Sequence, residues 1–140
     1  MSNLVMIVDD SLTVRKILEV SLKRAGVEVL AYTDGISALD ALTTGKLPSL
    51  PDVIILDVMM PKLNGFALAR MLRSKSYLRD IPIIMLTSRD SKLSEIRGRM
   101  AGATVYLRKP FKTQDIVETV GRFLKPTQQR LPPSYRSQAW

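Results

Sequence analysis

The chain has 140 residues, of which 46% are hydrophobic and 24% are charged, a composition typical of one soluble globular domain. It contains no cysteine and no histidine. These absences exclude disulfide bonds, zinc sites built from thiolate or imidazole ligands, and catalysis by a serine–histidine pair. Any metal site must therefore use oxygen ligands, which suit magnesium, calcium or manganese.

The net charge of +8 could serve a nucleic-acid partner. However, the basic residues are scattered, and no basic stretch is interleaved with aromatic residues that could stack on bases. We therefore expect a basic solvated surface and no nucleic-acid partner. No apolar stretch approaches the ~20 residues of a membrane span, and the N-terminus lacks the basic region of a signal peptide. We expect no membrane insertion and a cytoplasmic location.

Five short apolar runs predict the strands of a sheet. They are residues 4–8, 27–32, 53–56, 83–86 and 103–107. Four of them are nearly continuous, which is typical of parallel strands covered on both faces. The second run is more mixed and is expected to lie nearer an edge of the sheet.

Apolar stripes between these runs predict five helices. In chain order, the stripes consist of Val14, Ile17, Leu18, Ser21, Leu22 and Ala25; Ile36, Leu39 and Leu42; Phe66 to Leu72, in a helix that starts near Asn64; Leu93, Ile96 and Met100; and Ile116, Val120, Phe123 and Leu124. Alternating strands and helices predict an α/β fold, a doubly wound parallel (βα)5 sheet with helices on both faces. We expect a domain over residues 1–124. Residues 125–140 hold three prolines, three basic residues and no acid, and are expected to form a basic, flexible tail.

Polar residues gather where the predicted strands end, and ligands of open α/β sheets bind at that edge. These residues are Asp9, Asp10, Asp57, Thr87, Ser88 and Lys109. Three crowded carboxylates repel one another, and a divalent cation such as Mg²⁺ removes this conflict. Lys109 would be redundant in a site that held only a metal, so it indicates that a phosphoryl group also binds there. Asp57 could itself be the nucleophile and form an aspartyl-phosphate.

Structural roles remain open for the same residues. Asp9, Asp10 and Ser11 could cap the first helix, and Thr87 and Ser88 could cap the fourth. Lys109 could be a solvated lysine. Asp57 alone could be a residue of the turn that ends its strand.

Four motifs, in this order, resemble response-regulator receiver domains. They are IVDDS (7–11), LDVMMPKLNG (56–65), LTS (86–88) and YLRKPF (106–111). The resemblance covers residues 3–124 and implies a flavodoxin-like fold with strand order 2-1-3-4-5. It also implies that a histidine kinase phosphorylates Asp57.

The resemblance further implies a metal site for Mg²⁺, or for Mn²⁺ in its place. Asp10 and Asp57 would ligate the ion together with the backbone carbonyl of Met59, and Asp9 would act through a bound water. Met59 and Arg89 stand at two positions that vary in such families, and we hypothesise that they tune the phosphoryl lifetime. Alternatively, both side chains merely point to solvent.

The remaining roles implied by the resemblance concern the phosphoryl group and the switch. Lys109 would pair with a phosphoryl oxygen, and its peptide bond to Pro110 would be cis. Thr87 would move toward the phosphoryl group, although the register leaves Ser88 as a second hydroxyl for that role. Tyr106 would turn inward into the vacated space.

The sequence thus predicts a two-component response regulator without an output domain, which switches partner binding in chemotaxis, pilus motility or a phosphorelay. By the resemblance, the partner would bind the face formed by the fourth helix, fifth strand and fifth helix. We expect self-catalysed phosphoryl transfer and hydrolysis but no enzymatic turnover. The alternatives are an aspartate-nucleophile phosphatase, a nucleic-acid binder that uses the +8 charge, and a receiver that has lost phosphorylation. The phosphatase would need a second carboxylate where Met59 stands.

Overall fold

Five parallel strands form one sheet in the computed structural model, which describes residues 3–88 and 92–125. The strands are β1 (Leu4–Val8), β2 (Glu28–Tyr32), β3 (Val53–Asp57), β4 (Ile83–Thr87) and β5 (Val105–Arg108). Their order is β2-β1-β3-β4-β5, which confirms the expected order. The mixed second run forms the edge strand β2, as predicted. Arg89 and nearly all of the predicted tail lie outside the described residues.

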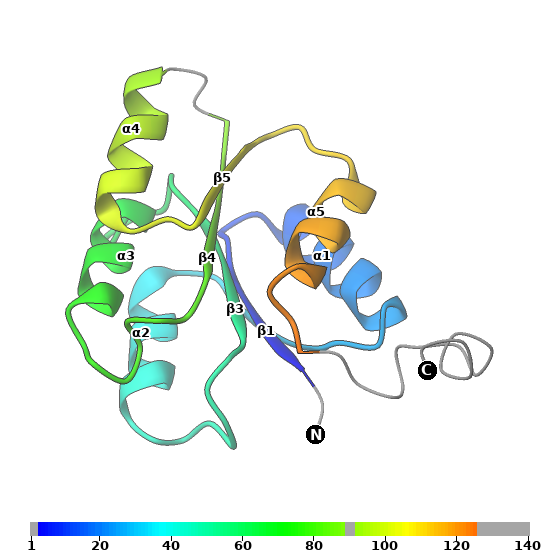
Figure 1. Ribbon diagram of the computed structural model, residues 1–140, viewed down its shortest axis with the longest axis horizontal. Helices are drawn as coiled ribbons and strands as arrows, with labels where there is room; N and C mark the ends of the chain where they lie inside the picture. The colour runs from blue at the N-terminus through cyan, green and yellow to red at the C-terminus, as the bar shows by residue number, and fades with distance from the viewer. Residues whose placement is uncertain (1–2, 89–91, 126–140) are drawn as a thin grey trace, which may run out of the picture.

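Helices cover both faces of the sheet, so the predicted doubly wound α/β fold is confirmed (Figure 1). Helices α1 (Leu12–Arg24) and α5 (Thr113–Gly121) lie on one face. Helices α2 (Gly35–Thr43), α3 (Gly65–Arg73) and α4 (Lys92–Ala101) lie on the other. No helix in the described part of the chain combines the length and the hydrophobicity that a membrane span requires.

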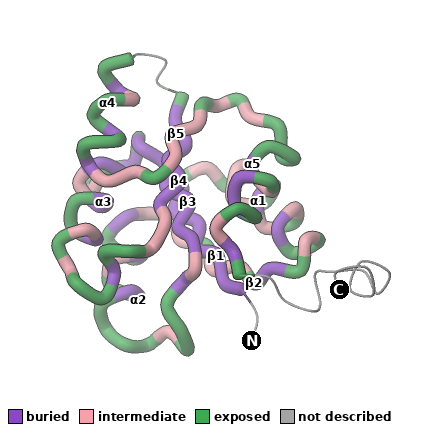
Figure 2. The backbone as a smooth tube through the Cα atoms, viewed as in Figure 1, coloured by how far each residue is buried: buried purple, intermediate pink, exposed green. Residues whose placement is uncertain are grey.

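The alternation of side chains along the strands divides the core into two layers. Val5 and Ile7 of β1 belong to the layer under α1 and α5, whereas Met6 and Val8 belong to the layer under α2, α3 and α4. Every residue of β1, β3 and β4 is buried, as Figure 2 shows for the centre of the molecule. This two-sided burial explains why these three runs are continuously apolar.

Side-chain caps fix where the helices begin after the strands. The Ser11 hydroxyl accepts the N–H of Val14 at the start of α1, at 3.3 Å. Asn64 likewise accepts the N–H of Ala67 at the start of α3, at 2.9 Å. Each cap satisfies a backbone donor that has no partner within its helix. The helices therefore begin close to the sheet edge at which the predicted polar residues collect.

The apolar stripe predicted for the fourth helix faces solvent and not the core. Leu93, Ile96 and Met100 are 67%, 50% and 82% exposed, whereas the buried residues of α4 are Ser94, Gly98 and Ala101. Small side chains are needed on the inner face because α4 lies close to its neighbours: a Cβ atom at Gly98 would lie 2.7 Å from the ring of Tyr106. Helix α4 was therefore predicted correctly as an element, but it leaves an apolar surface exposed.

Arg73, at the end of α3, ties three backbone segments together. Its guanidinium donates to the carbonyls of Arg79 and Ile81, both at 2.6 Å, and twice to that of Gly102, at 3.0 and 2.7 Å. Burial lowers the pKa of this guanidinium, against the opposing influence of Asp80.

We expect Arg73→Met to lower the free energy of unfolding by about 2–4 kcal/mol, because three backbone carbonyls, two of them partly buried, lose charged donors. Urea denaturation would measure the change. Arg70→Met, at an exposed position of the same helix, is the matched control and should stay within about 0.5 kcal/mol of the unchanged chain. Equal effects of the two substitutions would contradict this role for Arg73.

Candidate metal and anion site

Three carboxylates meet at the carboxyl ends of β1 and β3. Asp9 and Asp10 follow β1, and Asp57 is the last residue of the neighbouring strand β3. One carboxylate oxygen from each residue lies within 4.8 Å of the others. Asp9 and Asp57 are only 1% and 4% exposed, whereas Asp10 is open to solvent. The predicted acidic cluster is therefore assembled, and it lies partly inside the protein.

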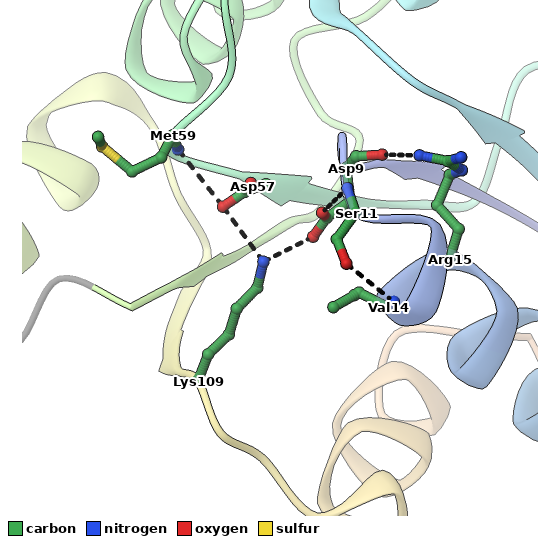
Figure 3. Close-up of polar contacts among 7 residues, drawn as sticks. All are labelled: Asp9, Ser11, Val14, Arg15, Asp57, Met59 and Lys109. Atoms are coloured by element: carbon green, nitrogen blue, oxygen red, sulfur yellow. Dashed lines mark hydrogen bonds and ion pairs between the residues drawn. The ribbon is translucent and has the colours of Figure 1, made fainter.

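Lys109 reaches this cluster from the segment after β5. Its ammonium lies 2.8 Å from Asp9 Oδ2 and 3.5 Å from Asp57 Oδ1, as Figure 3 shows. Its backbone N–H donates to the carbonyl of Thr87 at 2.7 Å, which holds the segment against the end of β4. The peptide bond between Lys109 and Pro110 is cis. The lone ammonium thus lies between two carboxylates.

Backbone donors orient the two buried carboxylates. The N–H of Ser11 donates to Asp9 Oδ1 at 2.9 Å, and the N–H of Met59 donates to Asp57 Oδ1 at 3.3 Å. Arg15 donates to the backbone carbonyl of Asp9 at 2.7 Å, also visible in Figure 3. Sequence reasoning missed Arg15, since a lone arginine in a helix carries no spacing signature.

The electrostatics of the cluster disfavour a charged Asp57. Burial raises its pKa, Asp9 and Asp10 act in the same direction, and Lys109 and the N–H of Met59 act against them, which together bring the pKa to about 6. Three carboxylates and one ammonium leave a formal charge of −2, which one divalent cation would neutralise. All the available donors are oxygens, the ligand type that Mg²⁺ prefers. The residues present therefore fit a magnesium ion.

The predicted hydroxyl residues occupy different environments at the end of β4. Thr87 is fully buried, whereas Ser88 is exposed. Asp57 pairs with Leu86 in the β3–β4 ladder, so Thr87 follows directly beside the acidic cluster. This register favours Thr87 as the inward-facing hydroxyl.

Tyr106 lies on β5 with its hydroxyl buried and without a hydrogen-bond partner in the described part of the chain. Its ring packs against α4 at Gly98, where a Cβ atom would overlap it. Sequence reasoning missed Gly98. The available signal was the spacing of the small residues Ser94, Gly98 and Ala101, which the neighbouring apolar residues obscured.

A cleft of 400 Å³ opens beside the acids. Asp10, Met59, Met60, Pro61 and Asn64 line it. The Met59 side chain is 48% exposed and contributes no polar group to the cleft. The cleft gives an incoming molecule access to the exposed side of the carboxylate cluster.

Comparison with known proteins identifies the family. The family model described as "response regulator receiver domain" matches residues 5–121 of this chain. Protein PilG of Pseudomonas aeruginosa is 34% identical over 116 residues, which cover 83% of this chain and 83% of PilG. Response regulator MprA of Mycobacterium bovis is 39% identical over 127 residues, which cover 91% of this chain. The match covers 53% of MprA, so this chain spans about half the length of that relative.

Solved structures agree with the sequence comparison. Chemotaxis protein CheY4 of Vibrio cholerae superposes with a TM-score of 0.79 at 35% identity, covering 89% of this chain and 100% of CheY4. The match over residues 5–121 includes the three carboxylates and Lys109. The chain therefore belongs to the family of response regulator receiver domains of two-component signalling systems.

Proposed function

We propose that Asp57 of this receiver accepts a phosphoryl group from a histidine kinase, and that phosphorylation switches the binding of a downstream protein. The position of Lys109 carries the proposal, because its ammonium contacts the carboxylates of Asp9 and Asp57 at once. A phosphoryl group on Asp57 would bring new anionic oxygens next to that ammonium. Transfer of this kind depends mainly on positioning and on charge stabilisation, so no histidine base is required.

Receiver domains bind Mg²⁺ at an acidic cluster, and the cluster here fits the ion. Asp10 and Asp57 would hold it with the carbonyl of Met59, while Asp9 would act through water. When bound, Mg²⁺ neutralises the carboxylates and the charge that develops on the phosphoryl oxygens. Asp57 then serves as the nucleophile: its oxygen bonds to phosphorus as the phosphorus–nitrogen bond of the phosphohistidine breaks.

The switch is assigned to Thr87 and Tyr106. Thr87 is buried beside Asp57. The hydroxyl of Tyr106 lacks a hydrogen-bond partner among the described residues, so the Tyr106 side chain can move without breaking a hydrogen bond. The downstream target would bind the face formed by α4, β5 and α5, where α4 exposes apolar side chains. The likeness to chemotaxis protein CheY4 supports chemotaxis-type signalling, with pilus motility or a phosphorelay as related roles.

An aspartate-nucleophile phosphatase has less support. Its general acid would stand two residues after Asp57, and Met59 occupies that position. The Met59 side chain is half exposed and cannot donate a proton. We therefore infer self-catalysed transfer and hydrolysis without turnover of phosphate esters.

Mass spectrometry of the intact chain after incubation with a small acyl phosphate tests the proposed function. In Mg²⁺, the chain should gain the mass of one phosphoryl group, because the ion offsets the negative charge of the donor and of Asp57. A chelator should reduce the labelling at least about 100-fold, a loss comparable to removing a main charge-stabilising group. Labelling that is equal with and without Mg²⁺, or steady turnover of a phosphate ester, would contradict the proposal.

A further inference from the structure

The chain leaves the domain toward its C-terminus beside the edge strand β2. Asn3, which is buried, donates from its side-chain amide to the carbonyl of Lys125 at 2.9 Å. The N–H of Lys125 donates back to the amide oxygen of Asn3 at 3.2 Å. The backbone carbonyl of Asn3 also accepts the N–H of Glu28, the first residue of β2, at 3.0 Å. Lys125, the last described residue, therefore lies next to the beginning of β2.

A groove of 510 Å³ lies at this end of β2, away from the acidic site. Its walls include Leu4 and Val27, the first residues of β2 as far as Leu30, and Pro48 from the segment between α2 and β3. Most of these side chains are apolar, but the exposed residues Lys23 and Glu28 also line the groove, and the Lys23 ammonium already pairs with Glu19 at 2.8 Å. The groove thus combines an apolar lining with the carboxylate of Glu28 and with a lysine that is paired to Glu19.

Strand β2 also has an open edge. Within the described residues it pairs only with β1, through groups such as the N–H of Glu28 and the carbonyl of Tyr32. Backbone groups alternate in direction along a strand, so those of Val29 and Ala31 point away from β1. Such an edge accepts an additional extended segment, and proteins usually cover or protect it.

We propose that the last residues of this chain, 134–140, dock along the edge of β2 and place the indole of Trp140 in the groove. Residues 126–133 contain three prolines, which lack N–H donors, and therefore act as a spacer. Residues 134–140 contain no proline, so every second N–H of an extended segment there can pair with the strand edge. Trp140 supplies a large apolar side chain that matches the groove.

Charge and length both favour this segment as the occupant. Residues 126–140 carry Arg130 and Arg136 and no acid, which complements Glu28 at the rim of the groove. Fifteen residues span up to about 50 Å when extended, far more than the distance from the exit point to the adjacent groove. The groove therefore gives the apolar end of the predicted tail a defined place on the domain.

Trp140 is the only tryptophan of the chain, so its fluorescence reports directly on docking. In the full chain, acrylamide should quench it about threefold less than in the urea-unfolded chain, because a docked indole is largely covered. Glu28→Arg should remove this protection by repelling the basic segment. The control Glu118→Arg reverses the charge of a different exposed acid, which lies on α5 and does not line the groove, and it should leave the protection intact.

Amide hydrogen exchange supplies a second readout that does not depend on tryptophan. The N–H groups of Val29 and Ala31 should exchange slowly in the full chain and faster in Glu28→Arg. Quenching of Trp140 as strong as in the unfolded chain would overturn the proposal. Protection that survives Glu28→Arg, or that is lost equally in Glu118→Arg, would also overturn it. Protection that disappears on dilution would also overturn the proposal, because the groove would then be occupied by the tail of a second copy of the chain.

Discussion

Replacing Asp57 with asparagine is expected to abolish phosphorylation and to raise the free energy of unfolding of the metal-free chain at pH 7 by about 1–3 kcal/mol. The first effect follows because an amide cannot form the acyl phosphate. The second follows because the substitution removes a carboxylate that burial and two neighbouring acids disfavour. Lys109 keeps its closer contact, with Asp9 at 2.8 Å.

The pH dependence gives this prediction a definite sign. Burial raises the pKa of Asp57 to about 6 in the folded chain, against about 3.9 for an aspartate in an unfolded chain. Between these values the folded state binds the proton more tightly, so the contribution of Asp57 to the stability of the unsubstituted chain falls as the pH rises through this window. Asparagine does not titrate. The stabilisation by Asp57→Asn should therefore be complete above pH 6 and absent below about pH 4.

Urea denaturation in the presence of a chelator, at both ends of this pH window, measures the effect. Asp40→Asn is the matched control, since Asp40 is exposed on α2 and far from the cluster in the fold. It should change the free energy of unfolding by less than about 0.5 kcal/mol at either pH. A gain in Asp57→Asn that is the same at both pH values would show that burial of the charge is not its cause.

Gly65→Ala is expected to lower the free energy of unfolding by about 3 kcal/mol, because it overpacks a backbone contact. A Cβ atom there would overlap the carbonyl oxygen of Asp57 and would lie 2.9 Å from Cα of Val58. Neither atom can move away without shifting the end of β3. The same shift would displace Asp57, the proposed phosphoacceptor, so phosphorylation should also slow markedly.

Helix propensity alone predicts that alanine at position 65 raises the free energy of unfolding, so the sign of the change distinguishes the two effects. Alanine is favoured over glycine by about 1 kcal/mol inside a helix. At Gly121, in α5, an added Cβ atom would meet nothing within 4 Å. Gly121→Ala should therefore leave stability unchanged or raise it, and chemical denaturation of the two variants compares the cases. A stable Gly65→Ala that is phosphorylated normally would refute the close approach of α3 to β3.

The sequence predicted the sheet well because two-sided burial imposes a simple pattern. Residues of β1, β3 and β4 are apolar up to the carboxyl ends of the strands, and polar residues appear there. Asp57 was visible for this reason: it ends a buried strand with a carboxylate. The meeting of Asp9, Asp10 and Asp57 then followed from the parallel arrangement of neighbouring strands.

Helix α4 shows where this reasoning fails. Apolar residues at helical spacing normally mark the buried face, but here the face that packs closely can hold only small residues such as Gly98 and Ala101. The larger apolar residues lie on the outer side of the helix, on the face that we propose binds the downstream protein. Individual side-chain contacts also could not be predicted from the sequence, because nothing in the spacing indicates that Arg15 donates to the carbonyl of Asp9.

The central claim is that the three carboxylates share one divalent cation, and calorimetric titration of the full chain with Mg²⁺ tests it most directly. We predict one ion per chain, with affinity reduced at least about 10-fold in Asp10→Asn, which removes an exposed ligand. Asp40→Asn, with the same change of charge at a distant site, should bind normally. The absence of Mg²⁺ binding, or an equal loss of affinity in Asp10→Asn and Asp40→Asn, would contradict the account.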